Sequence, residues 1–450
     1  MSFDPSKVRQ FRFVSWDFKA ETATASFTYG FDTGECFVEE LVFHGADVRM
    51  NAEKQRALNL CLQHLHLMLG ISYYKAAVPP EIVIEAGSID EGSARFFDEI
   101  YLKGLGEFAY RNSLDLRGRI RFPFVPSARP CRSPMALARR TAVPLGGGKD
   151  SVVSLEVLRS AQEPLMLFSL GEFEAIERVA RVSGLPMATV KRRLSQDLLA
   201  LNSRGALNGH IPISAVIAFV LPVCAILYGF DSSVLSNERS ASAGNLDYRG
   251  MGINHQYSKG FEFERNVSRH FRERLLQQFD YFSLLRPLSE LQIARLFSRS
   301  AAYHPVFTSC NAAFKIDHGR RIDRWCCACP KCRSTFLLMA PFMEKSRLIA
   351  IFGQNLLDRQ DQMSGFEELL GVRGLKPFEC VGEPEEYIAA FLLLLERPEW
   401  QDDVAVNHFR SSVLPGIVDP AGIVEHVLSF SSAHIIPPRY EVLLRAYSGF

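Results

Sequence analysis

One glycine-rich segment, residues 146–151 (GGGKDS), has the residue types of a phosphate-binding loop. Glycine lets the backbone approach an anion closely because no Cβ stands in the way. The free N–H groups of a helix that begins at such a loop attract phosphate. Lys149 adds a cation, Ser151 adds a hydroxyl donor, and Asp150 is placed either to hold Mg²⁺ or to cap the helix. The pattern predicts nucleotide phosphate binding, and a glycine turn before a capped helix is the alternative.

The spacing of this loop excludes two better-known phosphate loops. A P-loop places Ser or Thr directly after its Gly-Lys pair, whereas Asp150 follows Lys149 here. The dinucleotide fingerprint has a third glycine where Ser151 stands. The loop resembles the S-G-G-x-D-S loop of the PP-loop ATP pyrophosphatases, with Gly146 in place of the usual first Ser. Residues 168–186 (FSLGEFEAIERVARVSGLP) resemble the second strand and helix of the same family.

Four cysteines have the spacing of a structural zinc site. Cys326, Cys329 and Cys332 form two overlapping C-x2-C pairs, and Cys310 lies upstream. Closed tetrahedral zinc sites take four such thiolates, and a redox cluster without metal is the alternative. Cys327 interrupts the spacing and is expected to be the spare thiol. A similar cluster follows the PP-loop domain in 7-cyano-7-deazaguanine synthases, so the resemblance implies structural zinc.

Two polar segments and one further cysteine are candidates for proton transfer. Residues 236–240 (SNERS) follow a predicted strand and would reach the carboxyl edge of the sheet, where ligands bind in such folds. Residues 254–260 (NHQYSKG) are rich in groups that transfer protons. Both segments could equally be solvated loops. For Cys380 a buried apolar thiol is favoured over a reactive one.

The front of the chain, to about residue 122, is expected to be an α+β unit. Its predicted strands and helices, in chain order, are strands 12–18, 22–31 and 36–43, helix 51–74, strand 81–85 and a helix from 88 to about 110. Ser88 and Glu91 have the spacing of a capping box at the start of that last helix. Prolines then mark residues 123–134 as a linker.

From residue 139 strands and helices alternate, which predicts an α/β core with a doubly wound parallel sheet. The predicted elements are strands 141–145, 165–170, 187–191 and 233–236 and helices 150–161, 172–183 and 211–230. After residue 334 the chain is expected to be mostly helical, with 336–357 and 384–395 as the clearest helices. We therefore predict three parts: an N-terminal α+β domain (1–135), a PP-loop (adenine nucleotide alpha hydrolase-like) domain with the four-cysteine cluster (136–335), and a helical C-terminal region (336–450).

Composition and hydropathy indicate a cytoplasmic protein that binds neither nucleic acid nor membrane. The 51 Lys+Arg and 50 Asp+Glu leave a net charge of +1, so no global field attracts nucleic acid. Residues 211–230 carry no charge and are long enough to span a bilayer, but they contain Pro212 and Pro222 and lie inside the α/β pattern. A helix buried on both sides has the same hydropathy and is preferred here. The first residues lack an apolar signal segment.

Over nearly its whole length the chain resembles the UDP-N-acetylmuramoyl-L-alanyl-L-glutamate epimerases, the MurL family of peptidoglycan precursor synthesis. The assignment rests on the overall arrangement and on segments such as NHQYSKGFEFE, residues 254–264. The resemblance implies epimerisation of the terminal L-Glu of UDP-MurNAc-L-Ala-L-Glu to D-Glu through an acyl-adenylate, with release of AMP and diphosphate. It implies ATP, Mg²⁺ and structural Zn²⁺ as cofactors, and a front domain that binds the UDP-sugar. The nucleotide-binding residues would be Gly146, Gly147, Gly148, Lys149, Asp150 and Ser151.

The sequence does not name the base and acid that move the Cα proton. Lys149 and Asp150 are expected at the phosphates, and the proton-transfer pool is His255, Lys259, Glu238 and Cys380, in that order. One alternative is another adenylating PP-loop enzyme, either a 7-cyano-7-deazaguanine synthase-like ligase or a tRNA-modifying enzyme. The other is an RNA-binding module built on the basic residues around the cysteines, which an intact ATP loop disfavours.

Overall fold

The computed structural model describes residues 2–315, 319 and 321–450. The strands are β1 (Gln10–Lys19), β2 (Thr24–Phe31), β3 (Cys36–Phe43), β4 (Glu81–Ile84), β5 (Thr141–Pro144), β6 (Leu165–Leu170), β7 (Met187–Arg193), β8 (Ser232–Leu235), β9 (Leu246–Tyr248), β10 (Met251–Ile253) and β11 (Asp280–Ser283). The helices before the cysteine cluster are α1 (Ala52–Leu69), α2 (Ile71–Tyr74), α3 (Glu91–Gly104), α4 (Gly106–Arg111), α5 (Lys149–Ser160), α6 (Glu174–Ser183), α7 (Gln196–Asn202), α8 (Ile213–Tyr228), α9 (Phe261–Arg274) and α10 (Glu290–Phe297). The later helices are α11 (Pro330–Met339), α12 (Lys345–Phe352), α13 (Met363–Leu369), α14 (Pro384–Leu394), α15 (Val404–His408), α16 (Pro420–Val427) and α17 (Pro438–Ser448).

Nine of the strands form one sheet in the order β11-β8-β5-β6-β7-β3-β2-β1-β4. The half from β11 to β7 is parallel throughout. The chain enters that half at β5, adds β6 and β7 on one side, and then adds β8 and β11 on the other. The order therefore reverses between β5 and β8, and ligands bind outside the carboxyl ends of the strands at such a reversal. The predicted α/β class with a mainly parallel sheet is confirmed.

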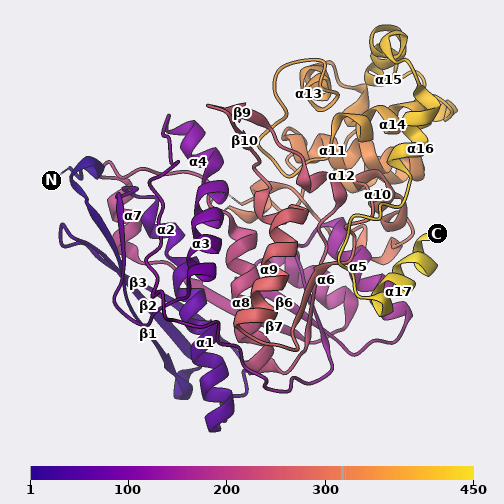
Figure 1. The fold of residues 1–450 in the computed structure, drawn as a ribbon. Helices are drawn as coiled ribbons and strands as arrows, with labels where there is room; N and C mark the ends of the chain where they lie inside the picture. Colours follow the sequence, from indigo (N-terminus) through magenta and orange to yellow (C-terminus); the bar gives the residue numbers. More distant parts are fainter. Residues whose placement is uncertain (1, 316–318, 320) are drawn as a thin grey trace.

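The front strands extend this sheet rather than forming a separate one. β3 pairs antiparallel with β7, with Glu40 opposite Arg193 and Phe43 opposite Val190. β2 and β1 continue the antiparallel ladder, and β4 adds a parallel edge. Figure 1 shows these N-terminal strands leading into the parallel half of the molecule. The boundaries predicted at 135/136 and 335/336 stay predictions, but the backbone ladder runs continuously past the first of them.

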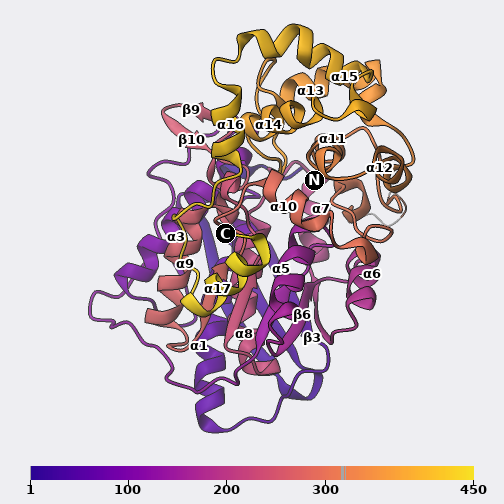
Figure 2. The same ribbon diagram turned by 90° about the vertical axis from the view of Figure 1, so that its right-hand side faces the viewer.

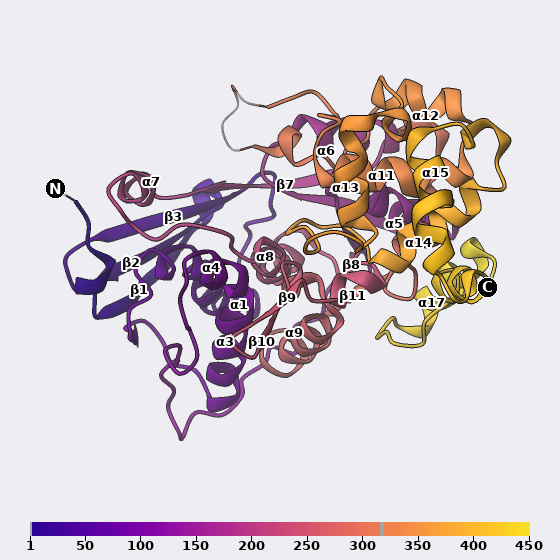
Figure 3. The ribbon, with the colours of Figure 1, turned by 90° about the horizontal axis from the view of Figure 1, so that it is seen from above.

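Helices cover both faces of the sheet and divide the interior into two apolar cores. Neighbouring residues of β5 point to opposite sides, so that Ala142 lies in one core and Val143 in the other. The first core contains α1, α3, α8 and α9, and the second contains α5, α6, α10 and the C-terminal helices. Figure 3 shows α8 and α9 beside α1 and α3, with α5 and α6 on the other side of the parallel strands.

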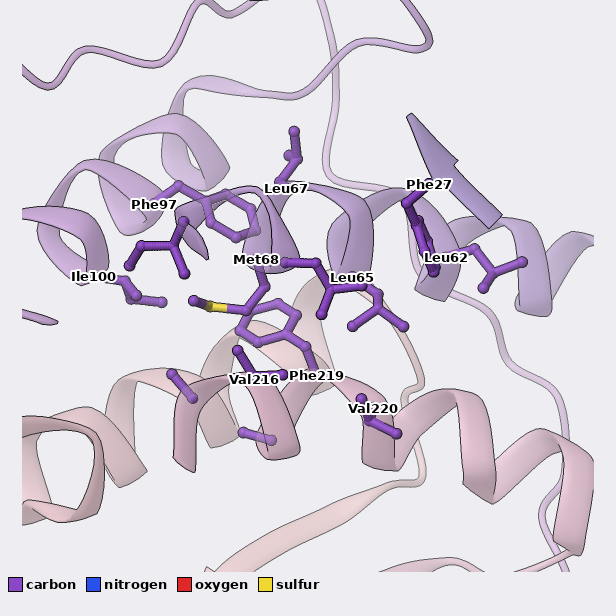
Figure 4. Close-up of a cluster of buried hydrophobic side chains, with 14 of the residues drawn as sticks. Phe27, Leu62, Leu65, Leu67, Met68, Phe97, Ile100, Val216, Phe219 and Val220 are labelled. Atoms are coloured by element: carbon purple, nitrogen blue, oxygen red, sulfur yellow. The ribbon is translucent and has the colours of Figure 1, made fainter. Parts of the chain in front are cut away.

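The charge-free segment forms α8, an internal helix of the first core. Figure 4 shows Val216, Phe219 and Val220 of α8 facing Leu65 and Met68 of α1, and all of these residues are buried. Because the helix is covered on several sides by other apolar helices, it needs no polar face. Across the described residues, we find no helix with both the length and the apolar character that crossing a membrane requires.

Two helix predictions are wrong in detail. The capping-box residue Ser88 does not cap α3, because the Asp90 side chain accepts hydrogen bonds from the backbone N–H groups of Gly92 and Ser93. Asp90 is also paired with Arg274 of α9, which fixes the helix start by a tertiary contact. The helix predicted over 336–357 is instead α11 and α12, since Pro341 interrupts it.

The C-terminal part is built from helices, as predicted. They pack on α10 and α11, with α14 against both α11 and α16. Figures 1 and 2 show the group from α11 to α16 standing above the end of the sheet where α5 and α10 begin, while α17 returns to α5. This placement closes the space above the carboxyl ends of β5 and β8.

Candidate active site

The glycine loop connects β5 to α5 at the point where the strand order reverses. Gly147 has φ +75°, a left-handed conformation that favours glycine. Gly148 is the N-cap of α5, and a Cβ there would lie 2.6 Å from Ser309 Oγ. A Cβ at Gly146 would meet no atom within 4 Å. The position where this chain departs from the PP-loop pattern therefore has room for the usual serine.

Lys149 is buried at the start of α5, between two carboxylates. Its Nζ donates to Asp150 Oδ1 at 2.5 Å and to Glu290 of α10. Burial opposes the charge of Lys149, but Asp150 and Glu290 outweigh it and raise the pKa of Lys149. The lysine thus remains a cation at the base of the loop.

Glu238 and Lys259 lie on separate segments that one buried arginine ties together. Arg286 donates from Nη1 to the carbonyl of Glu238 and from Nη2 to the carbonyl of Lys259, each at 2.5 Å. Its charge is balanced by Glu264 at 2.7 Å. As predicted, residues 236–240 follow strand β8 and reach its carboxyl end. The interpretation of Glu238 as part of a solvated loop is wrong, because the residue is buried.

Cys380 lies in the same place, next to three basic groups. Its Sγ is 3.2 Å from Lys259 Nζ, and it is hydrogen-bonded to His255. Burial disfavours the thiolate, but Lys259, Lys331 and His255 outweigh it and lower the pKa of Cys380 to about 6. The favoured interpretation of Cys380 as an apolar buried thiol is therefore wrong, because its neighbours are cations rather than hydrocarbon.

His255 is held between Cys380 and a buried carboxylate. Its Nδ1 is 2.5 Å from Glu107 Oε2 on α4, and its ring lies 4.4 Å from that of His210. Burial opposes the imidazolium, but the hydrogen bonds to Cys380 and Glu107 raise the pKa of His255 to about 9. His210 is affected in the opposite sense, since burial and the charge of His255 lower its pKa to about 4.

These groups line one small cavity of about 50 Å³. The residues that line it come from the loop, both sides of the strand-order reversal and the C-terminal helices: Lys149, Asp150, Glu238, Lys259, Glu290, Ser309, Lys331, Ser334, Thr335 and Cys380. The structure brings five of the predicted chemical residues to this cavity, namely Lys149, Asp150, Glu238, Lys259 and Cys380. His255 stands behind Cys380.

The four predicted metal-binding cysteines meet beside the glycine loop. The Sγ atoms of Cys310, Cys326, Cys329 and Cys332 all lie within 4.8 Å of one another. Three of the Sγ–Sγ separations are 3.5, 3.7 and 3.9 Å. Tetrahedral bonds of about 2.3 Å to zinc place sulfurs about 3.8 Å apart, so the donor set fits a zinc ion. Cys327 points away and contacts the Phe352 carbonyl at 3.3 Å, as expected of the spare thiol.

The cysteine site is joined to the glycine loop through residues 308–310. The Thr308 N–H donates to the Gly147 carbonyl at 2.9 Å, and the Thr308 hydroxyl donates to the Arg324 carbonyl at 2.6 Å. Cys310 lies two residues further along the chain, and its Sγ is 3.9 Å from Cys329 Sγ. Order at the cysteines is therefore transmitted to the loop by backbone contacts.

Several residues of the site could not be found from the sequence. Glu107, His210, Arg286 and Glu290 lie in segments without a recognisable motif. The sole local signal concerns Glu290, which follows Ser289 in a Ser-x-x-Gln capping box at the start of α10. Two further groups of ligand atoms lie within 4.8 Å of one another: Glu107, His210 and His255, and Asp150, Glu238 and Glu290.

Comparison with known proteins assigns the chain to a family. Residues 2–284 match the MurL N-terminal domain and residues 306–419 the MurL C-terminal domain. The UDP-N-acetyl-alpha-D-muramoyl-L-alanyl-L-glutamate epimerase of Xanthomonas oryzae pv. oryzae is 43% identical over 447 residues, 99% of each chain. The proteins of the same name from Salinispora tropica and a Micromonospora species are 43% and 42% identical, over 90% and 96% of this chain and 88% and 96% of their own. As its sequence features predicted, the chain belongs to the MurL family.

Proposed function

We propose that this protein converts the terminal L-Glu of UDP-MurNAc-L-Ala-L-Glu to D-Glu, using ATP to activate the glutamate α-carboxylate. The observation that carries the proposal is the shared cavity, in which a phosphate-type glycine loop faces a thiol flanked by basic groups. A loop alone would fit any adenylating enzyme. The proton-transfer groups directly beside it fit activation followed by exchange of a Cα proton, and the relatives carry the name of that epimerase.

Adenylation addresses the chemical difficulty of this epimerisation. The Cα–H next to a free carboxylate is a very poor acid, because its removal would create two adjacent negative charges. Transfer of AMP to the carboxylate removes one charge and turns the acyl group into a better electron sink. A base can then take the Cα proton and an acid can return one on the opposite face. Hydrolysis of the acyl-adenylate would release AMP and the D-Glu product.

The glycine loop would carry out the nucleotide part of this reaction. Residues 146–151 would bind the phosphates through backbone N–H groups, and Lys149 would stabilise charge on the departing diphosphate. Mg²⁺ prefers oxygen ligands, and we assign it to Asp150, which lines the cavity and whose carboxylate lies within 4.8 Å of those of Glu238 and Glu290. The proposed core is a PP-loop fold, because the loop follows β5 where the strand order reverses.

A zinc ion held by the four cysteines would have a structural role. Four thiolates complete a tetrahedron and leave no open coordination position for a substrate. The ion would hold residues 308–310 against Gly147. The N-terminal part of the chain would bind the UDP-sugar end of the substrate. Because ATP and a UDP-linked precursor are both substrates, we place the reaction in the cytoplasm.

The reaction can be tested with ATP, Mg²⁺ and UDP-MurNAc-L-Ala-L-Glu in D₂O. We expect AMP and diphosphate, deuterium at the glutamate Cα, and a D-configured product. Gly147→Ala should lose AMP formation, because the φ of +75° at Gly147 strains any residue with a Cβ, and that Cβ would lie 3.3 Å from the Phe314 ring. Gly416→Ala is the matched control, since a Cβ there meets no atom within 4 Å. Intact ATP with unchanged substrate would overturn the proposal, and AMP without deuterium would indicate a different adenylating enzyme.

A further inference from the structure

We propose that Cys380 is the base that takes the glutamate Cα proton, and that His255 and Glu107 are positioning residues that hold its thiolate. The inference rests on the proposed function and names the group that its proton-transfer step requires. The sequence alone placed Cys380 last among the proton-transfer candidates, after His255, Lys259 and Glu238, and the structure places it first. The arrangement is Cys–His–Glu, a thiol beside an imidazole that a carboxylate orients, which is the general pattern of an activated cysteine.

The geometry fixes each member of this group from a different segment. His255 Nδ1 is hydrogen-bonded to Glu107 Oε2 at 2.5 Å. The other ring nitrogen, Nε2, is therefore the one that can interact with Cys380. The His255 backbone N–H is itself bound by Asn245 Oδ1 at 2.8 Å. On the other side, the Gln256 side chain donates to the carbonyl of Val381 at 3.3 Å. The backbones that carry the thiol and the imidazole are thereby tied to each other.

The charges around the cluster favour the thiolate as the base. Lys259 is half-buried; desolvation lowers its pKa, but Cys380 and Glu238 outweigh this effect and raise the pKa. His255 is also held protonated near neutral pH, whereas Cys380, with a pKa of about 6, is deprotonated. The further titratable groups around the cluster are Lys331 of α11, Glu107 and Arg111 of α4, the neutral His210, and, across the cavity, Lys149, Asp150, Glu238 and Glu290.

The position of Cys380 relative to the glycine loop matches the place where the proposed substrate would carry its Cα. In an acyl-adenylate formed at residues 146–151, the acyl carbon is joined through one oxygen to the single phosphate that remains after diphosphate has left. Cys380 lines the same cavity of about 50 Å³ as Lys149 and Asp150. A Cα attached directly to that acyl carbon would therefore face the thiolate. The ammonium groups of Lys259 and Lys331 stand beside the place where negative charge would collect.

The step balances without any further reactant. As the Cα–H bond breaks, an S–H bond forms at Cys380, and the C–H electron pair moves into the acyl group as an enolate. Protonation of Cα on the opposite face by a solvent-derived proton gives the D configuration. The Cys380 thiol then returns its proton to solvent. One solvent proton enters and one substrate proton leaves, which is the exchange that D₂O detects.

Cys380→Ala separates adenylation from proton transfer. We expect this variant to retain substrate-dependent exchange of labelled diphosphate into ATP, since that step needs the glycine loop and no Cα base. Deuterium incorporation at Cα should fall about 10²–10⁴-fold, the usual contribution of a general base. Cys131→Ala, at an exposed cysteine, is the matched control and should retain both. A Cys380→Ala variant that exchanges deuterium at the wild-type rate, or that loses diphosphate exchange as well, would overturn the assignment.

Alkylation of the wild-type protein tests the thiolate without relying on the folding of a variant. The rate of iodoacetamide attachment at Cys380, followed by peptide mass spectrometry, should rise with a midpoint near pH 6, because the thiolate is the reacting form. Glu107→Gln and His255→Gln should move this midpoint upward, along with the acid limb of the epimerisation pH profile. A midpoint near 8.5, the ordinary value of a cysteine, in the wild-type protein would contradict the proposal.

A covalent role for Cys380 is a separate outcome. If the thiol attacks the acyl-adenylate, denaturing mass spectrometry of the wild-type protein during turnover should show a substrate-sized adduct on Cys380. That adduct would overturn the base assignment and make Cys380 a nucleophile. Failure of the proposed function itself looks different, because the wild-type protein would then form no AMP with this substrate.

Discussion

Lys149 and Glu290 form a buried ion pair, in which Lys149 belongs to the glycine loop and Glu290 to the start of α10. Lys149 lies at the phosphate loop, whereas Glu290 begins α10 and its backbone N–H donates to Glu386 at 2.7 Å. Removing one partner of a buried pair costs much more than removing both, because a lone buried charge is left uncompensated. Stability and activity should therefore respond differently to single and double substitution.

We expect Lys149→Met to lower the free energy of unfolding by about 3–5 kcal/mol. The double variant Lys149→Met/Glu290→Gln should recover most of that loss. The rate of AMP formation should remain about 10²–10³-fold below that of the wild-type protein in both variants, because each lacks the cation at the diphosphate. Urea unfolding and an AMP assay measure the two effects. Lys7→Met, at an exposed lysine, should change stability by less than about 0.5 kcal/mol. Equal destabilisation of the single and double variants would contradict the pairing.

At the scale of elements, the cysteine cluster and the glycine loop act as one unit. Thr308, which contacts Gly147 of the loop, lies only two positions along the chain from Cys310, which belongs to the cluster. α11 begins at Pro330 inside the cluster and brings Lys331 to the cavity. A metal ion bound by the four thiolates would therefore help to order this region, since metal binding couples to folding.

Cys326→Ser should therefore lose bound zinc and weaken ATP binding. We expect zinc to fall from one ion per chain to none, and ATP affinity to fall about tenfold or more, because small displacements of binding groups are costly. Metal analysis and calorimetry check these two outcomes. Cys327→Ser is the control within the same turn, since Cys327 Sγ contacts the Phe352 carbonyl instead of the cluster. Equal zinc loss in both variants would contradict the assignment of Cys327 as the spare.

At the scale of the whole molecule, one sheet passes through both apolar cores. The β3–β7 ladder joins the front strands to the parallel half. Helices α8 and α9, which the chain makes after β7, pack in the front core with α1. Neither core is thus built from one uninterrupted stretch of sequence. Loss of either core would expose apolar surface of strands that also form the other.

We expect the two cores to unfold together. Trp16 packs against the first core, and Trp400 is fully buried in the second. Variants that keep one of these tryptophans, with the other two replaced by Phe, should give the same urea midpoint by fluorescence. Coincident transitions from separate probes are the test of two-state unfolding. A lower midpoint for Trp16 would instead support an N-terminal domain that folds by itself over residues 1–135.

The geometry of the two motifs could be predicted from sequence because it depends on local spacing. Glycines and Lys149 within residues 146–151 act through one turn of backbone, and C-x2-C pairs bring thiolates together within a single loop. Strand–helix alternation likewise predicted the parallel half of the sheet, since each right-handed crossover is a local unit. The antiparallel joint between β3 and β7 has no such signal, because it pairs strands from distant parts of the chain.

The role of Cys380 shows what only tertiary structure decided. In sequence its neighbours are Glu379 and Val381, and a thiol in that setting is expected to be a small apolar side chain. Its pKa is lowered by Lys259, Lys331 and His255, which lie on other segments, and Glu107 of α4 orients that histidine. Local spacing determines which groups a loop can present, whereas the charge state of a buried thiol depends on every group that the fold packs around it.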